Sequence, residues 1–419
     1  MTSLPGGWDE VALRDLCLSI TKSDPVDLGR ETVRYVDIGS VDGSRHALVG
    51  VPEIPAAGVP SRCRQIIRSG DTVFSTVRPY LEKIAYVDDS LDHEFASTGF
   101  SVLRPGPRLV PKFLYYFSIS SGMLDQVLPY QKGVSYPAVL DREVRATMTP
   151  VPPLNEQRRI VDLLEDHLSR LDAAESYIQT IACRAENWHA GLVRRLLWSA
   201  NYPRASVGSL LREPIRNGRS DRAVQGTEAG TRTLTLTAVT KNAFTDKHSK
   251  LTITTADRAA GLWLEPGDVF VQRSNTPALV GTTALYDGPR EWAIFPDLLI
   301  RLRVDGRKIG ASFLTAALRS EDGHGQLRRK ARGLAGSMPK IDQAAVAGTE
   351  IPLPDLAEQE RVLQSVDLAT DALEKLLSEL DRSLRRCAAL RRSLLAAAFS
   401  GRILGSETDL SVAREMISA

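Results

Sequence analysis

The side chains in this sequence that are best suited to binding chemistry are clustered arginines and lysines. The denser cluster comprises Arg328, Arg329, Lys330 and Arg332, and a looser group contains Arg301, Arg303, Arg307 and Lys308. Cations at this density can neutralise the phosphates of a nucleic acid, and a solvated charged surface has the same composition. The sequence therefore marks this region as a candidate phosphate-binding surface, with a solvated charge run as the alternative.

Patterns that would give the chain catalytic chemistry are absent from the sequence. It contains no Gly-Lys pair for a Walker A loop, no H-E-x-x-H motif and no G-x-S-x-G motif. It also lacks the Asn-Pro-Pro-aromatic and Asp-Pro-Pro-aromatic tetrads of amino-methyltransferases. Asp88, Asp89, His93 and Glu94 fall in a polar segment, where a solvated turn is favoured over an acid–base pair. We therefore expect a chain that is not an enzyme.

The composition is that of an ordinary globular protein. Its 419 residues are enough for two to four domains, and its formal net charge of +2 does not by itself indicate a nucleic-acid partner. Cys17, Cys63, Cys183 and Cys387 are scattered singly, which favours buried free thiols over disulfides or a zinc site. No apolar run reaches about 18 residues and the start lacks a signal-peptide pattern, so the expected compartment is the cytoplasm.

The two halves of the sequence resemble each other at a period near 200 residues. Ser135-Tyr136-Pro137 matches Ser337-Met338-Pro339, and Glu156-Gln157 matches Glu358-Gln359, both at an offset of 202. Further upstream, Gly70-Asp71 matches Gly267-Asp268 at an offset of 197. Because the period is too long for a solenoid, it predicts duplication of a whole domain together with its connector.

Each half ends in a segment with the apolar spacing of a coiled coil. The first series alternates steps of four and three residues through Ile160, Leu164, His167, Leu171, Ala174, Ile178, Ile181, Ala185, Trp188 and Leu192. The second series, 202 residues later, is Val362, Val366, Ala369, Leu373, Leu376, Leu380, Ser383, Cys387, Leu390 and Leu394. Two such heptad seams in one chain can pair with each other. This pattern predicts packing roles, rather than metal or catalytic roles, for His167 and Cys387.

These patterns predict an α+β fold in which two globular domains alternate with two long helices. The expected segments are a first globular domain at 1–150, a helix with a proline-rich lead at 151–200, a second globular domain at 201–352, a second helix at 353–405 and a tail at 406–419. About 43 residues of helix make a rod of roughly 65 Å. A pseudo-two-fold axis between the halves would make the two helices an antiparallel coiled coil.

At this point the chain resembles a known family. The proline-rich leads into Leu154-Asn155-Glu156-Gln157 and Leu356-Ala357-Glu358-Gln359, and the ending of the second helix at 394–403, are similar to those of the DNA-specificity subunit of type I restriction–modification systems. The resemblance extends over nearly the whole chain.

The resemblance implies a non-catalytic, cytoplasmic adaptor that binds double-stranded DNA. Each globular domain would be a target-recognition domain for one half of a bipartite sequence, and the helices would set the distance between the halves. Two methyltransferase subunits would supply S-adenosylmethionine for N6-adenine methylation. Translocase-nuclease restriction subunits would use ATP and Mg²⁺. This chain itself would hold no cofactor or metal and would not bind a membrane.

Two loops at equivalent places in the halves carry the side chains expected to contact DNA. They are rich in hydrogen-bonding and basic residues, which suit base edges and phosphates respectively. The candidates in the first domain are Arg78, Tyr80, Lys83, Lys132, Ser135 and Tyr136. Those in the second domain are Arg273, Ser274, Asn275, Arg328, Arg329, Lys330, Arg332, Ser337 and Lys340.

A different class of function also fits the sequence. A duplicated coiled-coil scaffold could recruit other proteins without reading DNA. Within the DNA-reading class, both a full restriction system and a methyltransferase acting alone are compatible with the chain, and the target bases are not readable from it.

Overall fold

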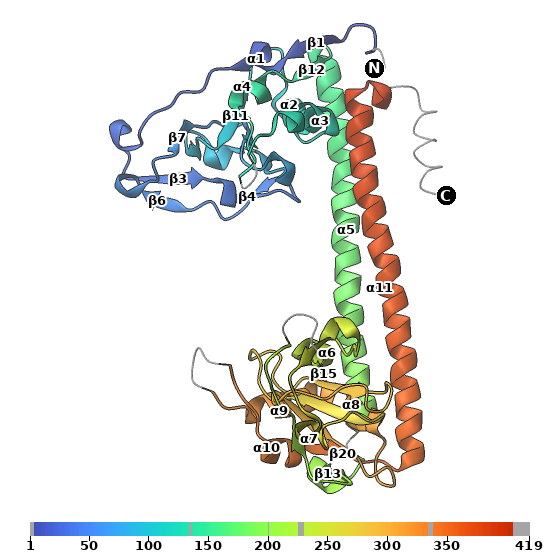
Figure 1. Ribbon diagram of the computed structural model, residues 1–419. Helices are drawn as coiled ribbons and strands as arrows, with labels where there is room; N and C mark the ends of the chain where they lie inside the picture. The colour runs from blue at the N-terminus through green and yellow to red at the C-terminus, as the bar shows by residue number, and fades with distance from the viewer. Residues whose placement is uncertain (1–3, 134–135, 200, 225–229, 334–337, 405–419) are drawn as a thin grey trace. The chain divides into compact units, whose positions relative to one another are not determined.

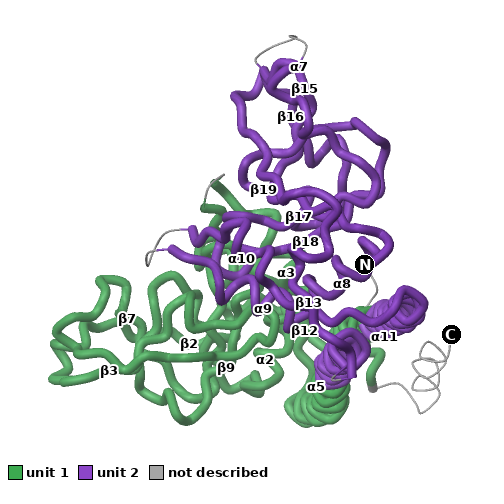
Figure 2. Tube along the Cα trace, turned by 90° about the horizontal axis from the view of Figure 1, so that it is seen from below, with its two compact units in different colours: residues 1–178, 381–419 green, residues 179–380 purple. Residues whose placement is uncertain are grey.

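The computed structural model describes residues 4–133, 136–199, 201–224, 230–333 and 338–404. These form two compact units, residues 1–178 with 381–419 and residues 179–380, which Figure 2 shows in different colours. Two helices of 44 residues each, α5 (Leu154–Leu197) and α11 (Leu356–Phe399), contribute to both units. The predicted α+β class with two sheet-rich domains and two long helices is confirmed. The predicted tail at 406–419 lies outside the described residues.

The first unit combines two four-stranded sheets with short helices. One sheet has the strand order β2-β11-β8-β9 and the other β6-β3-β10-β7. The helices are α1 (Leu13–Leu16), α2 (Pro111–Ser118), α3 (Ser121–Val127) and α4 (Asp141–Arg145). The strands are β1 (Asp9–Ala12), β2 (Cys17–Leu18), β3 (Thr32–Val36), β4 (Val41–Asp42), β5 (Ala47–Leu48), β6 (Glu53–Pro55), β7 (Cys63–Ile66), β8 (Thr72–Ser75), β9 (Ile84–Tyr86), β10 (Phe95–Ser97), β11 (Phe100–Pro105) and β12 (Met148–Val151).

The second unit repeats one of these sheets and replaces the other. Its four-stranded sheet, β14-β19-β17-β18, corresponds to β2-β11-β8-β9, while a β15–β16 hairpin stands in place of most of the second sheet. The strands are β13 (Arg204–Ser206), β14 (Arg216–Asn217), β15 (Thr231–Leu234), β16 (Ser249–Thr252), β17 (Asp268–Gln272), β18 (Thr283–Tyr286), β19 (Leu299–Leu302) and β20 (Glu350–Pro352). The helices are α6 (Leu236–Thr240), α7 (Ala256–Ala259), α8 (Ala311–Arg319), α9 (Glu321–Lys330) and α10 (Gln343–Ala347).

The matched Gly-Asp pairs have the same structural role in both halves. Gly70 and Gly267 have positive φ angles of 90° and 91°, which favour glycine, and each begins the turn before a central strand. The aspartate that follows is buried and accepts two hydrogen bonds from an arginine of the neighbouring strand, Arg104 to Asp71 and Arg303 to Asp268. A carboxylate removed from water needs such a paired cation, so the Gly-Asp match reflects a repeated buried ion pair.

Within each unit the two long helices run antiparallel. In the first unit, Ile160 and Leu164 near the start of α5 share one apolar core with Leu395 and Phe399 near the end of α11, and Figure 1 shows these helix ends beside α2 and α3. The second unit contains the equivalent arrangement of the other two helix ends. There, Leu197 near the end of α5 and Val362 near the start of α11 share one apolar core with α8. The antiparallel pairing expected from the duplication is therefore present in each unit.

Seventeen of the twenty predicted seam positions are buried or half-buried, and three are exposed. Leu164 and Leu171 are covered as expected, but Ala174 and Leu376 are exposed and 62% of Trp188 is exposed. Next to each exposed position, the residue that follows it is covered instead: Glu175, His189 and Leu377. Two of these three covered residues, Glu175 and His189, are polar, so the apolar spacing of the sequence did not identify them.

A buried glutamine at the start of each long helix joins that helix to its globular domain. Gln157 is 0% exposed, its Nε2 donates to Arg108 O and Pro152 O, and its Oε1 accepts from Val110 N. Gln359, 2% exposed, donates to the carbonyl oxygens of Lys308 and Pro354 and accepts from Gly310 N. These bonds explain why the Glu-Gln pair recurs in the sequence.

The preceding glutamates complete the junctions. Trp8 Nε1 donates to Glu156 at 2.9 Å, and Tyr202 Oη donates to Glu358 at 2.9 Å. Each glutamate therefore ties the strand that opens its domain, β1 or β13, to the helix that closes the same domain.

We expect Gln157→Leu and Gln359→Leu each to lower the free energy of unfolding by about 2–4 kcal/mol, because each leaves one buried N–H and two carbonyl groups without partners. Urea unfolding followed by circular dichroism measures the change. Gln364→Leu, at an exposed position of α11, is the control and should remain within about 0.5 kcal/mol of the parent. Equal stabilities for the buried and exposed variants would contradict the junction role.

Candidate nucleic-acid interface

In the first domain, backbone pairing brings the two predicted loops together. Arg78 N donates to Pro137 O at 2.6 Å and Val139 N donates to Thr76 O at 2.9 Å. Lys132 and Ala138 exchange two backbone bonds of 2.9 Å on the other side of the same segment. The loop after β8 and the loop before α4 therefore form one continuous surface, as their equivalent placement in the sequence suggests.

Arg78 and Tyr136 occupy the centre of this surface. The Arg78 guanidinium lies over the Tyr136 ring at 5.0 Å from its centroid, a cation–π contact. Arg78 also has a positive φ of 49°, a conformation that costs a non-glycine residue energy and is found where surrounding structure imposes it. Tyr80 and Lys132 are exposed nearby in these two loops. These four candidates are available to a ligand.

The second domain repeats the same pairing at equivalent residues. Ile341 N donates to Arg273 O at 2.8 Å, and Arg332 and Lys340 exchange two backbone bonds of 2.8 Å. The bridges Ser274↔Lys340 and Arg332↔Lys340 correspond to Val77↔Ala138 and Lys132↔Ala138 in the first domain. The paired loops of the second domain thus have the backbone framework of those of the first, with different side chains.

The dense basic cluster divides into exposed and internal members. Arg328, Arg329 and Arg332 are exposed at the end of α9 and just after it, and Arg328 Nε also donates to Pro277 O at 3.1 Å. Lys330 points inward instead. Its Nζ donates to Gly348 O at 2.7 Å and to Thr349 Oγ1 at 3.2 Å at the end of α10, and burial lowers its pKa. Lys330 therefore has an internal structural role in this domain.

The looser basic group is not a phosphate-binding surface at Arg301 and Arg303. Arg301 is buried on β19 and contacts Glu213 at 3.2 Å; Arg303, directly after β19, is half-buried and bonds Asp268 at 2.6 Å. Burial is the main cause that lowers the pKa of Arg301. The prediction was wrong for these two residues because residues two apart on a strand share one face, and on this face both guanidinium groups pair with carboxylates of the same domain.

Several other candidates are engaged within the protein. Lys83 Nζ donates to Ile38 O at 2.8 Å, Ser274 is buried, and Asn275 Nδ2 donates to Gln272 Oε1 at 2.7 Å. Lys340 is exposed beside Arg332. Ser135 and Ser337 lie outside the described residues.

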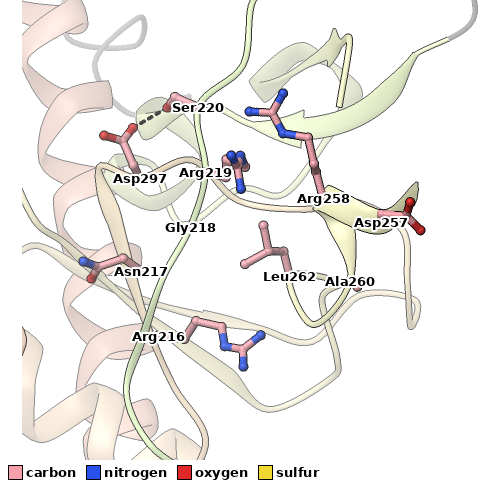
Figure 3. A pocket seen from close by; sticks show the side chains of 10 residues that line it. All are labelled: Arg216, Asn217, Gly218, Arg219, Ser220, Asp257, Arg258, Ala260, Leu262 and Asp297. Atoms are coloured by element: carbon pink, nitrogen blue, oxygen red, sulfur yellow. Dashed lines mark hydrogen bonds between the residues drawn. The ribbon is translucent and has the colours of Figure 1, made fainter. Parts of the chain in front are cut away.

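An arginine-rich cleft lies next to the second loop. It has a volume of about 750 Å³, and Figure 3 shows the side chains that line it: Arg216, Asn217, Gly218, Arg219, Ser220, Asp257, Arg258, Ala260, Leu262 and Asp297. Asp297 connects the cleft to the loop, because its carbonyl oxygen lies 3.5 Å from Arg273 Nη1 while its carboxylate accepts from Ser220. Arg258 pairs with Asp221 at 2.7 Å, so the cleft adjoins the loop with a mixed lining of arginines and aspartates.

Sequence reasoning missed this cleft. Its arginines are 39 or more residues apart except for Arg216 and Arg219, which flank a glycine. A residue larger than Gly218 is excluded because its Cβ would lie 2.1 Å from Phe295 O. In the sequence, the local feature that could have indicated the cleft is the segment from Arg216 to Arg219, in which two arginines lie close to a glycine that the structure requires.

The described residues contain no group of three or more histidine, cysteine, aspartate or glutamate side chains placed to hold a metal ion. Over the same ranges, no helix is long and apolar enough to cross a membrane. All four cysteines are free thiols; Cys63 and Cys387 are buried, and Cys183 is exposed, contrary to expectation.

Comparison with known proteins relates this arrangement to one class. Residues 5–181 match the family model of the type I restriction modification DNA specificity domain. The specificity subunit of the type I restriction enzyme StySPI from Salmonella potsdam is 25% identical over 315 residues, which cover 72% of this chain and 67% of that protein.

Two solved structures are similar over nearly the full length. One chain, from work on complex assembly and conformational transition of the type I R-M system, has a TM-score of 0.80 and 26% identity, covering 96% of this chain and 99% of that one. The HsdS subunit from Thermoanaerobacter tengcongensis has a TM-score of 0.59 and 27% identity, covering 96% and 98%.

The internal position of Lys330 gives a direct test of how the basic cluster divides. We expect Lys330→Met to lower the free energy of unfolding by about 1 kcal/mol, a value reduced for partial exposure, because the carbonyl groups at the end of α10 lose their donor. Thermal unfolding measures this. Arg329→Met, on the exposed side of α9, should leave stability unchanged, and a larger loss there than at Lys330 would reverse the assignment.

Proposed function

The chain belongs to the family of type I restriction–modification DNA specificity subunits, and from this premise we propose that it reads the two halves of a bipartite DNA target. Each globular domain recognises one half with its paired loops. The observation that carries the proposal is the repetition of one loop framework in both domains with different side chains. A duplicated scaffold with two different surfaces suits two different half-targets.

The exposed cations are proposed to hold the DNA backbone. Arg328, Arg329 and Arg332 form a dense run, which suits phosphates better than selective pairing with bases. Lys132 and Lys340 occupy the corresponding loops of the two domains. Arg78 and Arg273 each follow a matched central strand, and their guanidinium groups have the geometry for bidentate contacts with guanine.

The remaining activities belong to partner proteins in this proposal. The chain positions methyltransferase subunits, two in number, which use S-adenosylmethionine to methylate adenine at N6 after flipping the base from the duplex. Restriction subunits with ATP and Mg²⁺ join the same complex to cleave DNA. The chain itself is not catalytic in this proposal, and its setting is the cytoplasm.

Exposed apolar residues on the long helices support docking of those partners. Trp188 of α5 is 62% exposed, and Leu368 and Leu376 of α11 are also exposed. Large apolar side chains on a helix surface are typical of protein–protein contacts. This surface is therefore the proposed place for the methyltransferase subunits.

Exchange of residues 1–150 for the matching domain of a relative tests the proposed function. The chain is co-expressed with its methyltransferase subunits, and methylated adenines are mapped by sequencing. We expect the exchange to change one half of the methylated sequence and to leave the other half intact, because the loops of each domain are built within one unit. A change in both halves, or no methylation at a split target by the parent complex, would refute the proposal.

Removal of backbone contacts should change the salt dependence of binding. Arg332→Ala is expected to weaken binding to all sequences and to lower the slope of log K against log salt by about one unit, because one phosphate contact is lost. Fluorescence anisotropy at several salt concentrations measures the slope. Arg385→Ala, an exposed arginine of α11, is the control, and an equal slope in both variants would place Arg332 away from DNA.

The helices are proposed to set the spacing between half-targets. Seven residues inserted after Ile178 and seven after Leu380, where both helices pass from one unit to the other, preserve the seam and lengthen each helix by about 10 Å. The non-specific spacer should then grow by about three base pairs, with some loss of activity because DNA rotates with length. Mapping of methylated sites measures the spacer, and an active double insert with the original spacing would contradict this role.

A further inference from the structure

In both domains, the loop that precedes the last short helix, α4 or α10, exposes a large apolar side chain at an equivalent position. Tyr136 is 73% exposed and Met338 is 64% exposed. The two positions are related by the offset of 202 that also relates the helices, and each immediately precedes a proline. Single exposed apolar side chains are common on protein surfaces, but their recurrence at equivalent positions of both halves indicates a shared role.

Tyrosine and methionine have little in common apart from apolar bulk. Tyrosine has a hydroxyl group that donates and accepts hydrogen bonds, whereas methionine has only a thioether, which is a weak acceptor. A role that both positions share therefore depends on shape and hydrophobicity, not on hydrogen bonding to base edges.

The described segments around these side chains are paired through the backbone. Pro137 O accepts from Arg78 N at 2.6 Å, and the Arg78 guanidinium stacks on the Tyr136 ring. In the second domain, Arg332 and Lys340, which flank Met338 in the sequence, exchange two backbone bonds. A proline fixes the backbone on one side of each apolar residue.

Basic residues occur in the same loops as each apolar side chain. The Arg78 guanidinium lies over the Tyr136 ring, and Lys132 pairs through its backbone with Ala138, two residues after Tyr136. Arg332 pairs in the same way with Lys340, two residues after Met338. An apolar side chain in a loop that also carries exposed cations suits a residue that enters a DNA groove while cations such as Lys132 and Lys340 hold the phosphates.

We propose that Tyr136 and Met338 are wedges, one in each domain, that insert between neighbouring base pairs of the half-target and kink the duplex there. The inference rests on the proposed function, because it requires each domain to lie on DNA. Insertion of an apolar side chain unstacks a base step and bends the DNA around the protein, which brings more of the cationic surface into contact with phosphates. Flexible pyrimidine–purine steps would be preferred at these sites.

The test compares the parent complex with Tyr136→Ala and Met338→Ala on the target defined by methylation mapping. Permanganate reactivity reports unstacked thymines, and energy transfer between dyes at the DNA ends reports the bend. We expect Tyr136→Ala to abolish the unstacking in one half-target and Met338→Ala in the other, each with a smaller bend and about tenfold weaker binding. The slope of affinity against salt should fall by less than one unit, because a less bent duplex contacts fewer of the protein's cations although no cation is removed.

Conservative and unrelated variants separate a wedge from a merely structural residue. Tyr136→Phe and Met338→Leu keep the apolar bulk and should retain both the unstacking and the bend. Leu28→Ala removes an exposed apolar side chain outside both loops and should bind as the parent does. When the target adenine is flipped out, the thymine that paired with it becomes reactive to permanganate. This reactivity depends on the methyltransferase pocket and not on the wedge, so it serves as the internal standard.

The outcomes distinguish the wedge from the function on which it depends. If the parent complex methylates a split target but shows no unstacked step beyond the flipped base, the wedge is wrong and the proposed function stands. If alanine variants keep the unstacking, or if phenylalanine and leucine variants lose it, these residues are not wedges. If the parent binds no split target, both proposals fail together.

Discussion

The structure depends on a buried amide at the start of each long helix. Gln157 and Gln359 each make three hydrogen bonds in a dry environment, two to carbonyl groups and one from a backbone N–H. These bonds fix the direction in which the helix leaves its globular domain. Because a missing partner in such a place costs about 1–3 kcal/mol, the junction is specific as well as stable. The orientation of the reading loops relative to the adjoining helix segment follows from it.

Duplication then allows one framework to support two surfaces. The buried ion pairs Asp71–Arg104 and Asp268–Arg303 and the paired loops recur almost residue for residue. Outside this shared frame the domains diverge, since the first has the β6-β3-β10-β7 sheet and the second has the β15–β16 hairpin and the arginine cleft. The parts that position the loops are thus repeated, and the parts that differ lie where two unlike half-targets would require different contacts.

The sequence predicted what is periodic or repeated and missed what depends on long-range packing. The offset of 202 located both helices and the equivalence of the loops. It did not distinguish Trp188 from His189 as the seam residue, because both lie near the same helix face and only contact with α11, such as the His189–Thr370 hydrogen bond of 3.1 Å, decides between them. Lys330 belonged to the basic cluster by spacing, yet its long side chain reaches carbonyl groups of a helix that follows later in the chain. The cleft combines residues near 216, 258 and 297, which only the folded domain brings together.

Photocrosslinking from the two loops tests most directly whether each unit reads its own half of the target. A photoreactive amino acid is placed at Lys132 in one version of the chain and at Arg332 in another, and the complex is irradiated on a DNA duplex that contains the methylated target. Crosslinks from position 132 should map to one half of the target and those from position 332 to the other half. Crosslinks from both positions to the same half, or to the non-specific spacer, would contradict the account.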